Sequence, residues 1–106
     1  MSNETQKETP TITVFRKYRN GDIIAIFPFE ISNMSYYYCL SYEAIGQHGT
    51  ADPVHIIRQT KPATESEYAS LKLELERIGY VVETRKRITA DAIESRRKQL
   101  NKIAKS

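Results

Sequence analysis

The chain has 106 residues, enough for one domain with a modest core and too few for two. Hydrophobic residues make up 40% and charged residues 27%, a balance typical of folded globular proteins. A single cysteine excludes an internal disulfide, no apolar run reaches membrane-spanning length, and the first residues lack the apolar segment of a signal peptide. We therefore expect a cytoplasmic protein without a membrane partner.

The net charge of +3 is unevenly distributed along the chain. Residues 1–84 carry 8 Lys/Arg against 11 Asp/Glu, a net charge of −3, whereas residues 85–106 carry 8 against 2, a net charge of +6. The basic character is thus confined to the C-terminal end. Such a cluster can neutralise the phosphates of a nucleic acid, or it can keep a solvated helix face soluble.

The first predicted element is a hairpin. Residues 1–11 are polar and should form a disordered tail. Asn20-Gly21 then separates two β-rich runs between Ile12 and Pro28, which predicts antiparallel strands joined by a two-residue type I′ turn, with Val14 opposite Phe27. Both strands carry apolar residues on both faces, so we expect the sheet to be covered on both sides. Pro28 lacks an N–H group and should end the pairing, leaving residues 29–35 as a connector.

A tyrosine-rich strand follows. Alternation places Tyr36, Tyr38, Leu40 and Tyr42 on one face and Tyr37, Cys39 and Ser41 on the other. The glycine-rich run from Gly46 to Pro53 predicts a loop. The apolar run Val54–Gln59 predicts a fourth strand, which would pair with the tyrosine strand in a wide hairpin.

Two helices and a last strand complete the pattern. Thr64 with Glu67 three residues on is a capping box, the apolar stripe Tyr68, Leu71, Leu75 and Ile78 follows, and Gly79 is placed to end the helix. Tyr80–Arg87 predicts a strand. A second helix should begin after Thr89, but its apolar stripe is thin, which predicts that it docks weakly or needs a partner.

These elements predict an α+β fold in the order ββββαβα: an antiparallel sheet of about five strands with one helix packed on it and a basic C-terminal helix. The expected organisation is a disordered tail over residues 1–11, an α+β domain over residues 12–87 and the basic helix over residues 88–106.

With these elements placed, the chain resembles a family of small uncharacterised proteins of gut bacteria and their phages or mobile elements. The resemblance covers roughly residues 12–87. It is carried by Asn20-Gly21-Asp22, Ile24–Pro28, Cys39–Tyr42, Ile45–Gly49, Ala51-Asp52, Thr60–Thr64, Glu67-Tyr68 and Ile78–Tyr80. No activity is established for that family, so the resemblance implies no functional residues.

The glycine-rich run offers a first candidate site. Binding residues concentrate on loops held by a rigid scaffold, so Gln47, His48 and Asp52 would contact a protein partner, unless the glycines serve only to turn the chain. Zinc sites use closely paired Cys and His, whereas His48 and His55 lie seven residues apart beside one cysteine, so we expect no metal or other cofactor. Cys39 with either histidine would form a nucleophile and base, but a cysteine in mid-strand is typical of a small buried hydrophobe. We expect no enzymatic activity and no catalytic residues.

The basic end offers the second candidate site. Its cations are Arg85, Lys86, Arg87, Arg96, Arg97, Lys98 and Lys102. Separately, the tyrosine strand is compatible with base stacking, although half-buried tyrosines with wet hydroxyls explain it more simply and no RNA-recognition signature is present. The sequence therefore predicts a non-enzymatic binding module that contacts nucleic acid through this end, with a protein partner at the Gly46–Asp52 loop as the alternative.

Overall fold

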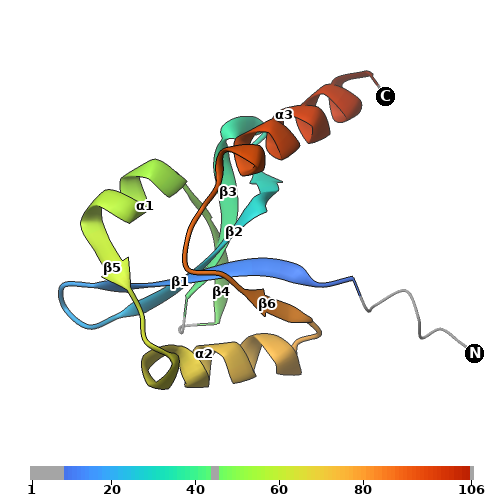
Figure 1. Ribbon diagram of the computed structural model, residues 1–106. Coiled ribbons are helices and arrows are strands. Elements are labelled where there is room, and N and C mark those ends of the chain that lie inside the picture. The colour runs from blue at the N-terminus through green and yellow to red at the C-terminus, as the bar shows by residue number, and fades with distance from the viewer. Residues whose placement is uncertain (1–8, 44–45, 106) are drawn as a thin grey trace, which may run out of the picture.

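The computed structural model describes residues 9–43 and 46–105 (Figure 1). Most of the predicted tail, residues 1–8, lies outside this range, and the first strand, β1 (Thr11–Tyr18), pairs antiparallel with β2 (Ile23–Ser32). In the turn between them, the Gly21 N–H donates to the Tyr18 carbonyl at 2.9 Å and the Tyr18 N–H to the Asp22 carbonyl at 2.8 Å. Three residues therefore form the loop, and the predicted two-residue type I′ turn is wrong.

The physical reason lies in the side chain of Asn20. Its Oδ1 accepts the Asp22 N–H at 3.0 Å, a local bond that favours a turn in which Gly21 alone takes a positive φ, 98°. The register consequently moves by one residue, so that Val14 lies opposite Ile26 instead of Phe27.

The type I′ geometry occurs one hairpin later. β2 turns into β3 (Ser35–Glu43) through Asn33 and Met34, whose φ angles are 57° and 51°. β2 also does not end at Pro28, which is fully buried within it. The pairing passes from Phe27–Leu40 directly to Ile31–Cys39, so a bulge accommodates the missing N–H group. The predicted connector over residues 29–35 is therefore strand and turn.

The predicted loop and fourth strand are also corrected. Residues Gln47–Ala51 form a strand, β4, which pairs with β3 and places His48 opposite Tyr42. The run after it is a helix, α1 (Pro53–Gln59). Asp52 caps this helix, because its side chain accepts the Val54 N–H at 3.0 Å, and Pro53 stands at the first helical position, where a missing N–H costs nothing.

The rest of the chain follows the prediction more closely. β5 (Thr60–Pro62) leads to α2 (Glu65–Arg77), and β6 (Val82–Thr84) leads to α3 (Ala90–Lys105). The sheet order is β4-β3-β2-β1-β5, antiparallel throughout, and β6 pairs with β1 in parallel. The predicted α+β fold with an antiparallel sheet is thus confirmed, with a helix, α1, in place of the predicted fourth strand and two strands, β4 and β5, that the sequence pattern did not reveal.

The capping box of α2 is confirmed. The Thr64 side chain accepts the Glu67 N–H, and the Glu67 carboxylate accepts the Thr64 N–H at 2.9 Å. Leu71 and Leu75 are buried, but Ile78 lies at the C-terminal cap, half exposed, and is not part of the core. Gly79 has a φ of 114° and ends the helix as expected.

Both faces of the sheet are covered, as predicted. α2 packs on one face over Phe15, Phe27 and Tyr42. The other face carries Val14, Ile26 and Cys39, against which Ile56 of α1 packs, and α1 and α3 lie on this side (Figure 1). No helix within residues 9–43 and 46–105 is long and apolar enough to cross a bilayer.

Candidate functional site

The basic end does not form one uniform surface, because Arg96 is buried. Its side chain is 4% exposed; Nε donates to the carbonyl oxygen of Tyr36 at 2.8 Å, and Nη1 donates to that of Pro28. One turn further along α3, Gln99 donates to the carbonyl of Phe29 at 2.5 Å and accepts the Ile31 N–H at 3.2 Å. Pro28 and Phe29 have no register partner on β3, so Arg96 and Gln99 supply donors for their carbonyl groups.

Arg96 therefore docks α3 on β2 and β3 and is not available to a phosphate, which corrects its place among the predicted nucleic-acid contacts. Burial lowers the pKa of its guanidinium. The expectation of weak docking rested on the thin apolar stripe. That expectation did not take into account the polar side chains of α3, which bind backbone groups of the irregular strand β2.

The remaining cations are exposed and fall into two groups. Arg85, Lys86 and Arg87 lie in the segment that joins β6 to α3, where the Arg85 Nη2 pairs with the Glu83 carboxylate at 3.1 Å. Arg97, Lys98 and Lys102 lie on α3, where the Arg97 Nη1 pairs with Glu94 at 3.0 Å. Surface pairs of this kind are weak and are readily exchanged for another anion.

The α3 group borders the tyrosines of β3. The Arg97 guanidinium lies 4.8 Å from the centroid of the Tyr36 ring, and the Tyr36 and Tyr37 rings stack with centroids 4.4 Å apart. Alternation along a regular strand would send these two rings to opposite faces. They meet because the β2–β3 pairing is irregular at this end of the hairpin. Tyr37 is 59% exposed, so its ring is open to a ligand.

We call the surface formed by Tyr36, Tyr37 and Arg97 the tyrosine–arginine surface; Lys98 is the next residue of α3 and is exposed. This surface joins the two features that the sequence had set apart, the aromatic strand and the basic helix.

The three residues of the predicted partner loop do not converge. Gln47 is exposed on β4, which is an edge strand of the sheet, and Asp52 caps α1. The His48 side chain instead points to the residues that follow the C-terminus of α2, where its Nε2 lies 2.7 Å from the hydroxyl of Tyr80. The hydroxyl of Tyr42, whose ring lies edge-on to His48, donates to Glu74 at 2.5 Å. These bonds fasten the β3–β4 hairpin to the C-terminal end of α2.

The candidate nucleophile and bases, Cys39 and the two histidines, lie in different surroundings. The Cys39 thiol is fully buried, and burial raises its pKa to about 11, which suppresses the nucleophilic thiolate. His55 lies on α1, exposed to solvent. Among the described residues there is no group of three or more His, Cys, Asp and Glu side chains that could hold a metal ion.

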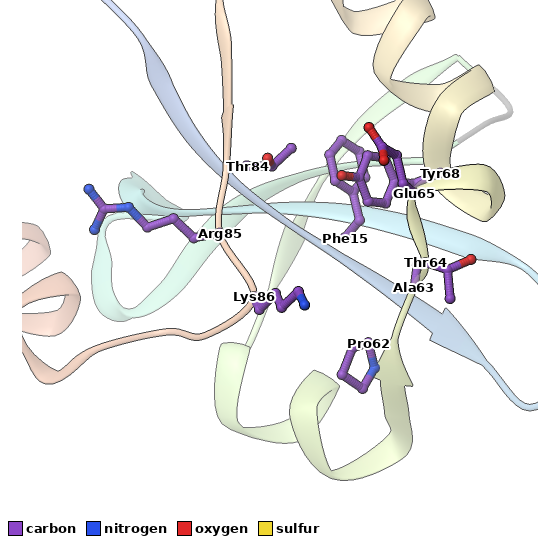
Figure 2. Close-up of a pocket in the computed structure, with 9 residues that line it drawn as sticks. All are labelled: Phe15, Pro62, Ala63, Thr64, Glu65, Tyr68, Thr84, Arg85 and Lys86. Carbon is purple, nitrogen blue, oxygen red and sulfur yellow. The ribbon is translucent and has the colours of Figure 1, made fainter.

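Sequence reasoning missed a cleft of about 580 Å³ at the edge of β1. β5 pairs with the C-terminal half of this edge and β6 with the N-terminal half. The segments that follow β5 and β6 leave β1 at neighbouring points. The Ala63 N–H donates to the Phe15 carbonyl at 3.1 Å, and the Arg85 N–H donates to the Thr13 carbonyl at 2.9 Å. One segment then leads to α2 and the other to α3, which lie on opposite faces of the sheet (Figure 1), and the cleft lies between the two segments. Its lining residues are Phe15, Pro62, Ala63, Thr64, Glu65, Tyr68, Thr84, Arg85 and Lys86 (Figure 2).

No family model, curated protein or solved structure matches the chain.

Proposed function

We propose that the protein is a non-enzymatic binding module for single-stranded nucleic acid, and that the tyrosine–arginine surface is its contact site. The observation that carries this proposal is the stack of exposed Tyr37 on half-buried Tyr36, with the Arg97 guanidinium beside it. Aromatic platforms flanked by cations are the arrangement with which proteins bind unpaired strands without sequence preference.

A base stacked on the open ring of Tyr37 would contribute about 1–3 kcal/mol, because every base has a π face to offer. Arg97 and Lys98 would contact the phosphates on either side of it, and Lys102 continues the same helix. A duplex hides its base faces within its own stack. The proposal therefore favours a single strand over a duplex.

A protein partner is the alternative. β4 is an edge strand with its first four residues exposed, and an exposed edge can pair with an added strand. This would use Gln47 and the backbone of β4, so it leaves the tyrosine–arginine surface untouched.

Fluorescence anisotropy with labelled single-stranded and duplex oligonucleotides, at low and high salt, tests the proposal. Tyr37→Ala removes the platform, and Val54→Ala is its matched control, because Val54 is a similarly exposed apolar side chain on α1, 61% against 59%. Lys98→Ala removes a cation, and Arg58→Ala, also on α1, is its control.

We expect the full chain to bind the single strand more tightly than the duplex, with a log–log salt slope of about −2 if three phosphates are contacted, at about −0.7 each. Tyr37→Ala and Lys98→Ala should each weaken binding, and the two controls should not. An equal loss from Arg58→Ala would mean general charge attraction. Failure to bind either probe at low salt would remove the proposal and favour a protein partner at β4.

A further inference from the structure

The cleft at the split edge of β1 has an aromatic floor. The rings of Phe15 and Tyr68 are stacked almost parallel, with centroids 4.2 Å apart and 9° between their planes. Phe15 is buried, whereas Tyr68 is only half-buried, so Tyr68 is the ring that solvent or a ligand can reach. A stack of two flat rings with one accessible member is a surface on which a third flat ring packs well.

The two walls of the cleft carry opposite charges. Lys86, on the segment after β6, is exposed and forms no ion pair within the described part of the chain. Figure 2 shows its side chain reaching from that segment toward the Pro62 side of the opening, while the Arg85 side chain extends the other way, where it pairs with Glu83. Glu65, at the start of α2, lies beside the two rings (Figure 2). Lys86 is thus the cation that the cleft offers to an anion.

The ion pair next to the cleft, Lys17 with Glu67, is already formed within the protein. Glu67 binds Lys17 and closes the capping box with Thr64, so neither of these charges is open to a ligand. A ligand of the cleft must therefore match one cation, one carboxylate and a flat apolar floor, in a volume typical of small-molecule sites.

We propose that this cleft binds a nucleotide: the base stacks on Tyr68, an exocyclic amine donates to Glu65, and the phosphate pairs with Lys86. A simple aromatic acid would leave Glu65 unpaired and much of the 580 Å³ unfilled. The same chemistry is presented by a free nucleoside phosphate and by the terminal nucleotide of a strand. The site is separate from the tyrosine–arginine surface and does not depend on strand binding there.

Amide chemical shifts of the isotope-labelled full chain, followed by NMR during titration, test this assignment. The probes are the common nucleoside 5′-monophosphates, with adenosine, ribose 5-phosphate and inorganic phosphate as partial ligands and a 5′-phosphorylated oligonucleotide as the strand-end form. We expect saturable shifts at Ala63, Thr64 and Lys86 with at least one monophosphate. The partial ligands should bind at least about tenfold more weakly, since each lacks at least one of the three contacts.

Lys86→Ala should weaken the nucleotide by about tenfold or more, whereas Arg87→Ala, which removes an adjacent cation outside the cleft, should leave it unchanged. Tyr68→Leu should weaken it as well, and its folding is checked by the spectrum itself. Tyr37→Ala should leave nucleotide binding intact, which separates this site from the proposed strand surface. If the phosphorylated oligonucleotide binds more tightly than the monophosphate, the ligand is the end of a strand. If the two bind equally, the ligand is the free nucleotide. Three results would overturn the proposal: amide shifts scattered over the lysines and arginines of the whole surface, a response to inorganic phosphate equal to that to the nucleotide, or no saturable shift with any monophosphate.

Discussion

The Nε of Arg96 donates a hydrogen bond of 2.8 Å to the carbonyl oxygen of Tyr36, and so joins the C-terminal helix to the strand that carries the tyrosines. The same guanidinium donates to the carbonyl of Pro28, inside the bulge that a proline within β2 requires. The bulge at Pro28 and the side chain of Arg96, 68 positions later in the sequence, thus form one structural unit. It places Arg97 over Tyr36 and thereby creates the surface proposed to bind nucleic acid.

The first prediction concerns this unit. Arg96→Ala should lower the free energy of unfolding by about 2–4 kcal/mol, because it removes packing and leaves buried carbonyls without donors. Arg97→Ala is the matched control on the next residue of α3; its exposed pair with Glu94 should change stability by less than about 0.5 kcal/mol. Urea denaturation of both variants measures the difference. Similar midpoints for the two would show that α3 is not docked through Arg96.

The second prediction concerns the turn between β2 and β3. Met34 holds a φ of 51°, which strains any residue with a Cβ, so Met34→Gly should stabilise the protein by up to about 1 kcal/mol. Met34→Ala, which removes the side chain but keeps the strain, is the control. Gly21→Ala in the first hairpin should have the opposite effect and cost about 1 kcal/mol, since Gly21 has a φ of 98°. Equal effects of glycine and alanine at position 34 would contradict the type I′ turn.

The third prediction compares two leucines of α2. Leu75 is 0% exposed in the cluster beneath the helix, so Leu75→Ala should cost about 2–5 kcal/mol. Leu73 is 49% exposed on the outer side, and Leu73→Ala should cost less than about 0.5 kcal/mol. Thermal or urea unfolding of the pair checks which face of α2 is buried, since the substitution itself is identical.

The features predicted correctly are those that local chemistry determines. Thr64 and Glu67 satisfy each other's backbone groups within one turn, and Gly79 provides a positive φ that other residues resist, so both ends of α2 could be read directly. The run after Pro53 was ambiguous, because a short apolar segment fits a strand or a buried helix equally. The segment forms a helix because Asp52 caps its N-terminus and Pro53 occupies the first helical position.

The features that were missed depend on distant parts of the chain. Met34 at a positive φ has no local signature, since that conformation is uncommon for such a residue. The parallel pairing of β6 with β1 is a long-range contact. The cleft is likewise assembled from Phe15, Tyr68 and Lys86, which no sequence spacing connects. The basic end was recognised from its charge, but only packing distinguishes buried Arg96 from its exposed neighbours.

The fourth prediction is a pH dependence. The hydrogen bond from Lys17, followed by that from the Thr64 backbone, lowers the pKa of Glu67 to about 2. A carboxyl whose pKa is depressed by folding contributes stability above its unfolded pKa, about 4.5, and this contribution is lost as the pH falls toward 2. Glu67→Gln keeps a capping-box side chain but removes the charge. The stability gap between wild type and variant should therefore be present at neutral pH and should close between about pH 4.5 and 2. A gap that persists unchanged at pH 2, measured by urea denaturation, would contradict the assigned pKa.

The last prediction concerns the thiol of Cys39. Burial raises its pKa from 9.0 to about 11, so at pH 8 the folded protein should hold about a hundredfold less thiolate than the unfolded chain. Reaction with a disulfide reagent should accordingly be slower in the native protein by at least this factor, because the fully buried sulfur is also shielded from the reagent. Ser70→Cys adds an exposed thiol on α2 as an internal control and should react at the rate of a free cysteine. The Cys39 rate should then rise in denaturant to match it. A Cys39 that reacts rapidly in the native state would mean an accessible thiolate, and would return Cys39 and His48 to consideration as nucleophile and base.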